Sequence, residues 1–168
     1  NYTYIYNWYR NNQSILVLNM PFEGGSNSTY TKDYSSFGND GTVHGASWNS
    51  TGGHDSSGAY EFDGVNDYIS APDSDSLEMR THDFSIAVWY KTSAPSEDGV
   101  LVGKRSSGSG TWEKWTGYSV FMEDGKIKVF VNLIGQNGDV IVADTSATND
   151  GNWHLVVGTY DRDGYMRA

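Results

Sequence analysis

The sequence predicts an all-β protein built from antiparallel strands, and three observations lead to that fold class. Glycine, serine, threonine and asparagine supply 20, 20, 12 and 13 of the 168 residues, whereas alanine supplies 8 and proline 3. This composition is rich in turn and strand formers and poor in helix formers. Apolar residues alternate along short segments between polar turns, and no stretch of a dozen residues carries a helical apolar stripe. Short strands at regular spacing favour a sandwich, a barrel or a jelly roll.

Residues 1–14 are expected to form an N-terminal aromatic strand that is distinct from the rest of the chain. Aromatic side chains occupy every second position from Tyr2 to Trp8, and the polar residues 10–13 then turn the chain. The strand is either the first strand of the main sheet or the tail of a preceding module. Residues 8–12 resemble the central strand and turn of immunoglobulin-like repeats, which agrees with the second interpretation.

Residues 83–91 form the clearest single strand. One face comprises Phe84, Ile86, Val88 and Tyr90, and the other comprises Ser85, Ala87 and Trp89. We expect these aromatic side chains, and those of Phe62 and Tyr68, to lie in the core or on a sheet face, because large aromatic residues usually supply packing area.

A hairpin is predicted downstream, where residues 117–122 and 126–132 flank Glu123-Asp124-Gly125. Glycine at the third position suits a turn residue with positive φ. Further strands are predicted over residues 140–144 and 153–160, and a single helical turn within residues 73–80.

Five motifs follow one another in an order that resembles a known family. They are residues 18–24 (LNMPFEG), 33–42 (DYSSFGNDGT), 58–69 (GAYEFDGVNDYI), 84–89 (FSIAVW) and 150–161 (DGNWHLVVGTYD). Together they are similar to the laminin-G-like jelly roll of the concanavalin A-like lectin and glucanase superfamily. The resemblance implies a two-sheet antiparallel β-sandwich over residues 15–168.

The resemblance also implies that the jelly roll is incomplete at its C-terminus. In the family, the strand that corresponds to residues 153–160 is followed by further strands that close both sheets, and this sequence stops shortly after it. Either the sequence is part of a longer protein, or a neighbouring subunit supplies strands by β-augmentation. In the second case the aromatic strand at residues 2–8 is the natural donor.

Charge, cysteine content and apolar run length exclude several classes of protein. The net charge of -10 disfavours binding to nucleic acid. The absence of cysteine excludes thiolate zinc sites, a cysteine nucleophile and disulfides. The longest apolar runs are much shorter than the roughly 20 residues of a membrane-spanning helix. We therefore expect no nucleic-acid partner and no membrane span.

The sequence does not predict an enzyme. The four histidines, His44, His54, His82 and His154, lie far apart and form no zinc-binding motif. Related glucanases carry three alternating carboxylates on one strand, whereas this chain offers only Glu61 and Asp63, followed at once by a turn.

A structural calcium ion is implied by the resemblance. It would be held near the Phe-Glu-Gly and GNDGT segments, which nominate Glu23, Asp33, Asn39 and Asp40. The alternative is that Asp33, Asn39 and Asp40 simply form Asx-turns.

A carbohydrate site would require exposed aromatic faces on a loop or a concave sheet. Trp112 and Trp115 lie in the polar loop 106–117, outside the alternating pattern, and are the candidates. The same loop could equally serve as a lid or as a contact surface.

Four Asn-X-Ser/Thr sequons occur within the first 51 residues, at Asn1, Asn12, Asn27 and Asn49. Their density is typical of a glycosylated protein that is secreted or displayed on the cell surface.

These observations predict a non-catalytic extracellular or cell-surface module that acts in adhesion or as a structural subunit of an assembly or filament. Its partners would be other protein subunits, as a homo-oligomer or filament, or further domains of the same chain. The alternative is a lectin-like, carbohydrate-binding module with glycan partners.

Overall fold

The computed structural model describes residues 4–80, 82–94, 99–106, 116–132, 139–142 and 146–161, with the backbone alone for 139–142. Every strand pairing among these residues is antiparallel. Their only helical element is a single 3₁₀ turn, η1 (Asp75–Leu77), within the segment that predicted one helical turn. The all-β fold class is therefore confirmed. No helix of this part of the chain is long and apolar enough to cross a membrane.

The chain divides into two compact units, residues 1–78 and residues 79–168. The first unit contains a two-stranded hairpin, a three-stranded sheet of order β3-β4-β7 and the pair β5-β6. Its strands are β1 (Tyr9–Arg10), β2 (Gln13–Ser14), β3 (Tyr30–Thr31), β4 (Gly41–His44), β5 (Ser47–Asn49), β6 (Ala59–Glu61) and β7 (Tyr68–Ser70).

Aromatic packing forms the core of the first unit. Buried Val43, Ala46 and Tyr60 pack against partly buried apolar neighbours, among them Phe22. The Phe22 ring meets the Tyr60 ring edge-on, with centroids 4.9 Å apart. Edge-to-face contacts of this kind add to the stabilisation that area burial alone supplies.

The N-terminal strand differs from its prediction. No strand occurs in the described part of the segment, residues 4–8. Instead, β1 and β2 form a hairpin around Asn11 and Asn12, whose φ angles of 50° and 63° are left-handed. Asparagine tolerates this region, which the tight hairpin turn requires.

Side-chain hydrogen bonds explain why residues 4–8 are not in a strand. The Tyr6 carbonyl accepts a hydrogen bond from Asn19 Nδ2 (2.9 Å), and Asn7 Nδ2 donates to the Tyr34 carbonyl (2.8 Å). The first contact occupies a backbone carbonyl of the segment that a sheet ladder would otherwise use, and the second ties the Asn7 side chain to a distant loop. Whether the segment acts as a donor strand or as the tail of a preceding module stays a prediction.

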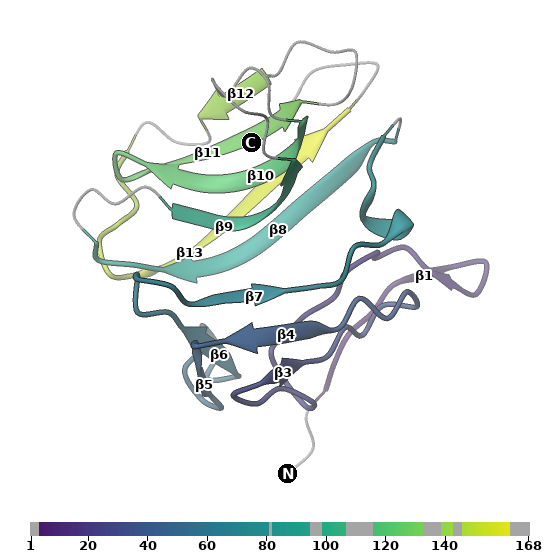
Figure 1. Cartoon of the computed structure of the whole chain (residues 1–168), viewed down its shortest axis with the longest axis horizontal. Coiled ribbons are helices and arrows are strands. Elements are labelled where there is room, and N and C mark those ends of the chain that lie inside the picture. Colours follow the sequence, from purple (N-terminus) through teal and green to yellow (C-terminus); the bar gives the residue numbers. More distant parts are fainter. Residues whose placement is uncertain are drawn as a thin grey trace. The chain divides into compact units, whose positions relative to one another are not determined.

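The second unit contains a four-stranded sheet of order β12-β11-β10-β9 and the pair β13-β8 (Figure 1). Its strands are β8 (Phe84–Lys91), β9 (Gly99–Ser106), β10 (Thr116–Glu123), β11 (Lys126–Asn132), β12 (Asp139–Val142) and β13 (Trp153–Tyr160). The predicted strands at 83–91, 140–144 and 153–160 match β8, β12 and β13 closely. The main core cluster comprises Tyr90, Val120, Met122, Ile127, Val129 and Val156.

The predicted hairpin is confirmed as β10 and β11. Asp124 and Gly125 form its turn with φ angles of 52° and 72°, both left-handed. Thr148 N donates to the Gly125 carbonyl at 2.9 Å and anchors this turn to a second loop.

Alternation along β8 is also confirmed. Ile86, Val88 and Tyr90 pack in the main core cluster, whereas Trp89 lies on the opposite face and is 46% exposed. Phe62 and Tyr68 are likewise about half exposed, at 51% and 53%. Trp89 and Tyr68 therefore lie on sheet faces and not in the core.

Candidate functional site

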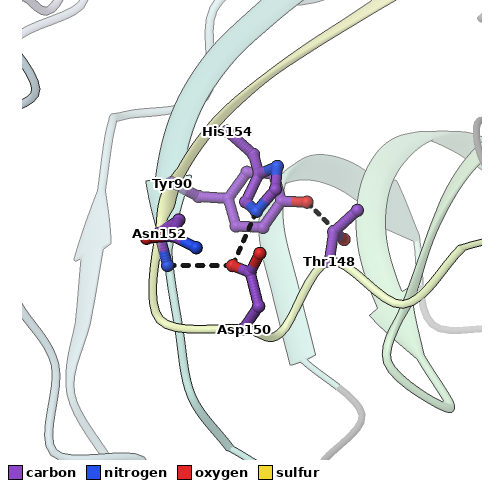
Figure 2. Close-up of polar contacts among 5 residues, drawn as sticks. All are labelled: Tyr90, Thr148, Asp150, Asn152 and His154. Carbon is purple, nitrogen blue, oxygen red and sulfur yellow. Dashed lines mark hydrogen bonds and ion pairs between the residues drawn. The ribbon is translucent and has the colours of Figure 1, made fainter.

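A cluster of polar and aromatic residues surrounds the start of β13 (Figure 2). Asp150 Oδ1 accepts hydrogen bonds from the Asn152 backbone N–H and from His154 Nε2, both at 2.9 Å. The imidazole stacks on the Tyr90 ring with centroids 5.6 Å apart. The Tyr90 hydroxyl donates to Thr148 Oγ1 at 2.6 Å. The cluster thus joins β8, β13 and the loop between Thr148 and Asn152.

The local sequence explains this arrangement. His154 and Tyr90 are directly opposite each other in the β8–β13 register, so their rings lie on one face. Asp150 forms an Asx-turn with Asn152, which directs its carboxylate back toward the strand. The hydrogen bond from the His154 ring, followed by those from Asn152, holds the pKa of the Asp150 carboxyl well below its usual range.

A carboxylate and the imidazole that it orients are also two of the three members of a nucleophile-activating triad. Within the described ranges, however, the His154 ring has no hydrogen bond besides the one to Asp150. No serine or threonine hydroxyl in the part of the chain that the structure describes is hydrogen-bonded to this ring. The cluster agrees with a structural role, in which it holds the turn at Asp150 against strands β8 and β13. The interpretation of His154 as a packing or surface residue agrees with this geometry.

Asp33 is the centre of a second polar network, in the first unit. It is 3% exposed, and its two oxygens accept four hydrogen bonds. Oδ1 accepts from Asn19 N (2.9 Å) and Ser35 N (2.8 Å), and Oδ2 accepts from Asn39 N (2.8 Å) and Ser35 Oγ (2.6 Å). All four lone-pair positions of the carboxylate are therefore used by protein donors.

Asp40 and Asn39 belong to the same network. Asp40 Oδ1 accepts from Asp33 N at 2.8 Å, and its Oδ2 accepts from the Tyr30 hydroxyl at 2.6 Å, which holds the pKa of the Asp40 carboxyl below its usual value. The Asn39 side chain donates to the Val17 carbonyl at 2.8 Å. The network therefore joins three segments of the first unit.

Glu23, the fourth residue predicted to bind calcium, accepts a hydrogen bond from the Gly58 backbone N–H. The residues that the structure describes contain no group of three or more acidic or histidine side chains placed to hold a metal ion. Asp33 does not fit a calcium ligand in this arrangement, because a cation would have to displace N–H donors from it. The Asx-turn interpretation is visible at Asp33, through Ser35 N. Calcium binding remains a prediction.

The two carboxylates weighed for glycoside hydrolysis both have local partners. Glu61 Oε1 accepts from Asn49 Nδ2 at 3.0 Å. Asp63 Oδ1 accepts from Val65 N at 2.8 Å and closes the turn in which Gly64 has a φ of 77°. Glu61 lies at the end of a strand and Asp63 lies in a tight turn, as the sequence predicts.

Trp112 and Trp115, the predicted sugar-stacking residues, lie outside the described residues. The first unit presents a different aromatic surface. Tyr68, on β7, stacks on His44, on β4, with centroids 4.3 Å apart and planes 15° from parallel. His44 Nε2 lies 3.2 Å from Ser70 Oγ. Tyr68 belongs to the motif at residues 58–69, whereas His44 lies just after the motif at 33–42. The sequence does not predict this pair, because the register between two strands cannot be read from either strand alone.

The sequons differ in their surroundings. Asn12 and Asn27 are exposed, Asn49 is half-buried on β5, and Asn1 lies outside the described residues.

The sheet formed by β8 and β13 has an apolar exposed face. Trp89 lies directly opposite Leu155, and Ala87 lies opposite Val157. The exposed fractions of Trp89, Leu155 and Val157 are 46%, 49% and 45%. We call these four residues the β8–β13 apolar face. Alternation in each strand marks these positions, but only the register shows that they adjoin.

Comparison with known proteins gives one match. Residues 62–168, more than half of the chain, match the laminin G-type family model described as the concanavalin A-like lectin/glucanases superfamily. No curated protein and no solved structure matches the chain. The match and the antiparallel sheets together confirm the predicted β-sandwich of the jelly-roll class. The family description covers both sugar-binding proteins and hydrolases, so the fold alone does not assign a function.

Proposed function

The chain belongs to the concanavalin A-like lectin/glucanase superfamily, and on that premise we propose that it is a non-catalytic extracellular module that binds other protein subunits. Its role is adhesion or the building of an extracellular assembly. The structural roles of Glu61 and Asp63 support the non-catalytic part, since Asn49 Nδ2 donates to the first and Val65 N to the second.

The β8–β13 apolar face carries the proposal. Contiguous exposed apolar residues on a folded protein mark contact surfaces, because leaving them in water is unfavourable. Trp89 is the natural anchor, since tryptophan is enriched at the centres of protein interfaces. Leu155 and Val157 flank it across the sheet and extend the apolar surface.

Sedimentation velocity at micromolar protein tests this function. We expect self-association of the wild-type chain, and we expect Leu155→Lys to remove it by placing a charge next to Trp89. Ser85→Lys is the matched control, because Ser85 is exposed on the same strand face but bonds to Thr159 rather than to the apolar residues. A wild-type chain that remains a monomer, or equal loss in both variants, would refute subunit binding through this face.

Carbohydrate binding is the second candidate, and the stacked Tyr68–His44 pair favours it. The exposed Tyr68 ring offers a flat face to the C–H groups of a sugar, while Ser70 supplies a neighbouring hydroxyl. Glycan-array binding that is lost in Tyr68→Ala would place the site on this sheet. Binding lost only in the double variant Trp112→Ala, Trp115→Ala would place it in the loop 106–117. No binding to any glycan would remove this candidate.

A further inference from the structure

We propose that Asn27 is the preferred N-glycan attachment site among the three sequons that the structure describes, at Asn12, Asn27 and Asn49. The sequence offers four sequons and ranks none of them. The structure distinguishes the three sequons that it describes by the hydrogen bonds that their side chains make. The inference rests on the proposed extracellular role only in that the chain must meet a glycosylating enzyme during secretion.

The polar atoms of Asn27 are fixed by the fold, apart from one. Its Oδ1 accepts hydrogen bonds from Thr29 N (2.9 Å), Thr29 Oγ1 (2.9 Å) and Tyr30 N (3.1 Å). Its backbone N–H donates to the Tyr30 carbonyl at 2.8 Å, and its carbonyl accepts from the Tyr60 hydroxyl at 2.8 Å. Among the described residues, Nδ2 alone has no partner, and the residue is exposed. The turn therefore presents one reactive atom to solvent.

The chemistry of attachment uses that atom and leaves the others intact. Nδ2 attacks C1 of the first sugar of a lipid-linked oligosaccharide diphosphate. The bond between C1 and the diphosphate oxygen breaks, the lipid diphosphate leaves with the bonding electrons, and Nδ2 gives up one proton to a base of the enzyme. Oδ1 is unchanged, so its three hydrogen bonds persist in the glycosylated protein. All three lie within residues 27–30, so this turn needs no distant part of the chain in order to form.

Asn49 differs because its Nδ2 already has a partner. It donates to Glu61 Oε1 at 3.0 Å across the β5–β6 pair. A Cβ placed on Gly52 would lie 2.9 Å from the same nitrogen, so the turn backbone closely approaches this atom. A glycan on Asn49 would crowd this turn and disturb the contact with Glu61.

Asn12 differs because the hydroxyl of its sequon has other partners. Ser14 is buried, and its Oγ lies 3.0 Å from Asn7 Oδ1 and 2.8 Å from the Leu16 carbonyl. The hydroxyl is therefore not directed to the Asn12 amide, in contrast to Thr29 and Asn27.

Site occupancy in protein secreted from a yeast host tests the proposal. Peptide-N-glycosidase treatment in heavy-oxygen water marks each formerly glycosylated asparagine, and mass spectrometry gives the occupied fraction of each sequon. We expect the highest occupancy at Asn27. An unmodified chain, or an occupancy at Asn12 or Asn49 above that at Asn27, would overturn the proposal. Self-association of unglycosylated protein from a bacterial host tests the proposed function separately.

Two variants test whether the side-chain hydrogen bonds determine which asparagine is glycosylated. Asn27→Asp keeps an oxygen acceptor for Thr29 and Tyr30 but has no amide nitrogen, so it should lose one glycan while keeping the wild-type melting temperature when unglycosylated. Glu61→Ala frees the Asn49 side chain and should raise occupancy at Asn49 at least twofold, with no change at Asn27. Unchanged occupancy at Asn49 would contradict the assigned role of Glu61.

Discussion

Asp33 shows how one buried carboxylate stabilises the first unit. Its four hydrogen bonds come from Ser35 and Asn39 in its own loop and from Asn19, which is 14 residues away along the chain. Asp33→Asn would turn an NH₂ group toward N–H donors, so we expect a loss of about 3 kcal/mol in the free energy of unfolding. Asp40→Asn should cost less, about 1 kcal/mol, because the Asp40 carboxylate accepts two hydrogen bonds in the network and Asp33 accepts four. Urea denaturation of the two variants measures both values, and equal losses would contradict the central role of Asp33.

The two possible roles of Asp33, as a hydrogen-bond acceptor and as a calcium ligand, predict different results for Asp33→Asn. If Asp33 acts only as an acceptor, Asp33→Asn destabilises the protein equally in calcium and in chelator. If Asp33 binds calcium, the wild-type melting temperature falls on chelation and the variant loses that response. Thermal unfolding of both proteins under both conditions distinguishes the two roles.

The lowered pKa of Asp150 predicts a pH dependence with a definite sign. A carboxyl whose pKa is lowered on folding from 3.8 contributes stability that is complete above about pH 5 and is lost as the pH falls through the folded value. The melting-temperature difference between wild type and Asp150→Asn should be constant from pH 7 to about pH 5 and should shrink below about pH 4.

His154→Phe is the matched variant for this prediction. It keeps a ring to stack on Tyr90 but removes the hydrogen bond that contributes most to the shift. We expect it to lose most of the acid dependence assigned to Asp150. A variant that keeps the full acid dependence would show that Asn152 alone sets the carboxyl pKa.

At the scale of single elements, the β10–β11 turn predicts a graded series of glycine substitutions. Gly125 has a φ of 72°, and an added Cβ would lie 3.1 Å from Asn149 Oδ1. Gly125→Ala should therefore cost about 1–2 kcal/mol. Gly38→Ala carries the same backbone strain, with φ at 68°, but meets nothing within 4 Å, so its cost should be smaller. Gly99→Ala has neither penalty and should be neutral within about 0.5 kcal/mol. Chemical denaturation that gives a different rank order would contradict this account.

Elements were predictable where the local pattern contains its own partner or alternates over a long run of residues. The β10–β11 hairpin carries both strands and the turn in one segment, and β8 alternates over eight residues. The segment 4–8 has the same alternation, yet it is not a strand, because Tyr6 and Asn7 bond to side chains and carbonyls that are distant in sequence. Alternation therefore indicates which side chains share an apolar face, but not whether another strand pairs with the segment.

At the scale of the whole molecule, the candidate sites were harder to predict than the fold. The five-motif order led to the sandwich fold that the family match confirms. The Tyr68–His44 stack joins residues that are 24 positions apart, and Trp89 and Leu155 in the β8–β13 apolar face are 66 positions apart. Both features therefore depend on the register between strands. Motif spacing along the chain does not contain that information.

The net charge of the chain predicts how self-association depends on salt, because charge repulsion opposes the proposed assembly. Each copy carries a charge of -10, so two copies repel at low ionic strength while their apolar faces attract. Salt screens this repulsion at distances beyond a Debye length, which is about 8 Å at physiological ionic strength, and does not weaken apolar contact. Self-association should therefore strengthen when sodium chloride is raised from about 50 mM to about 500 mM, and Leu155→Lys should remain monomeric at both concentrations. Sedimentation velocity of the two proteins measures this. Dissociation with added salt would show instead that ion pairs hold the copies together and that the β8–β13 apolar face is not the contact.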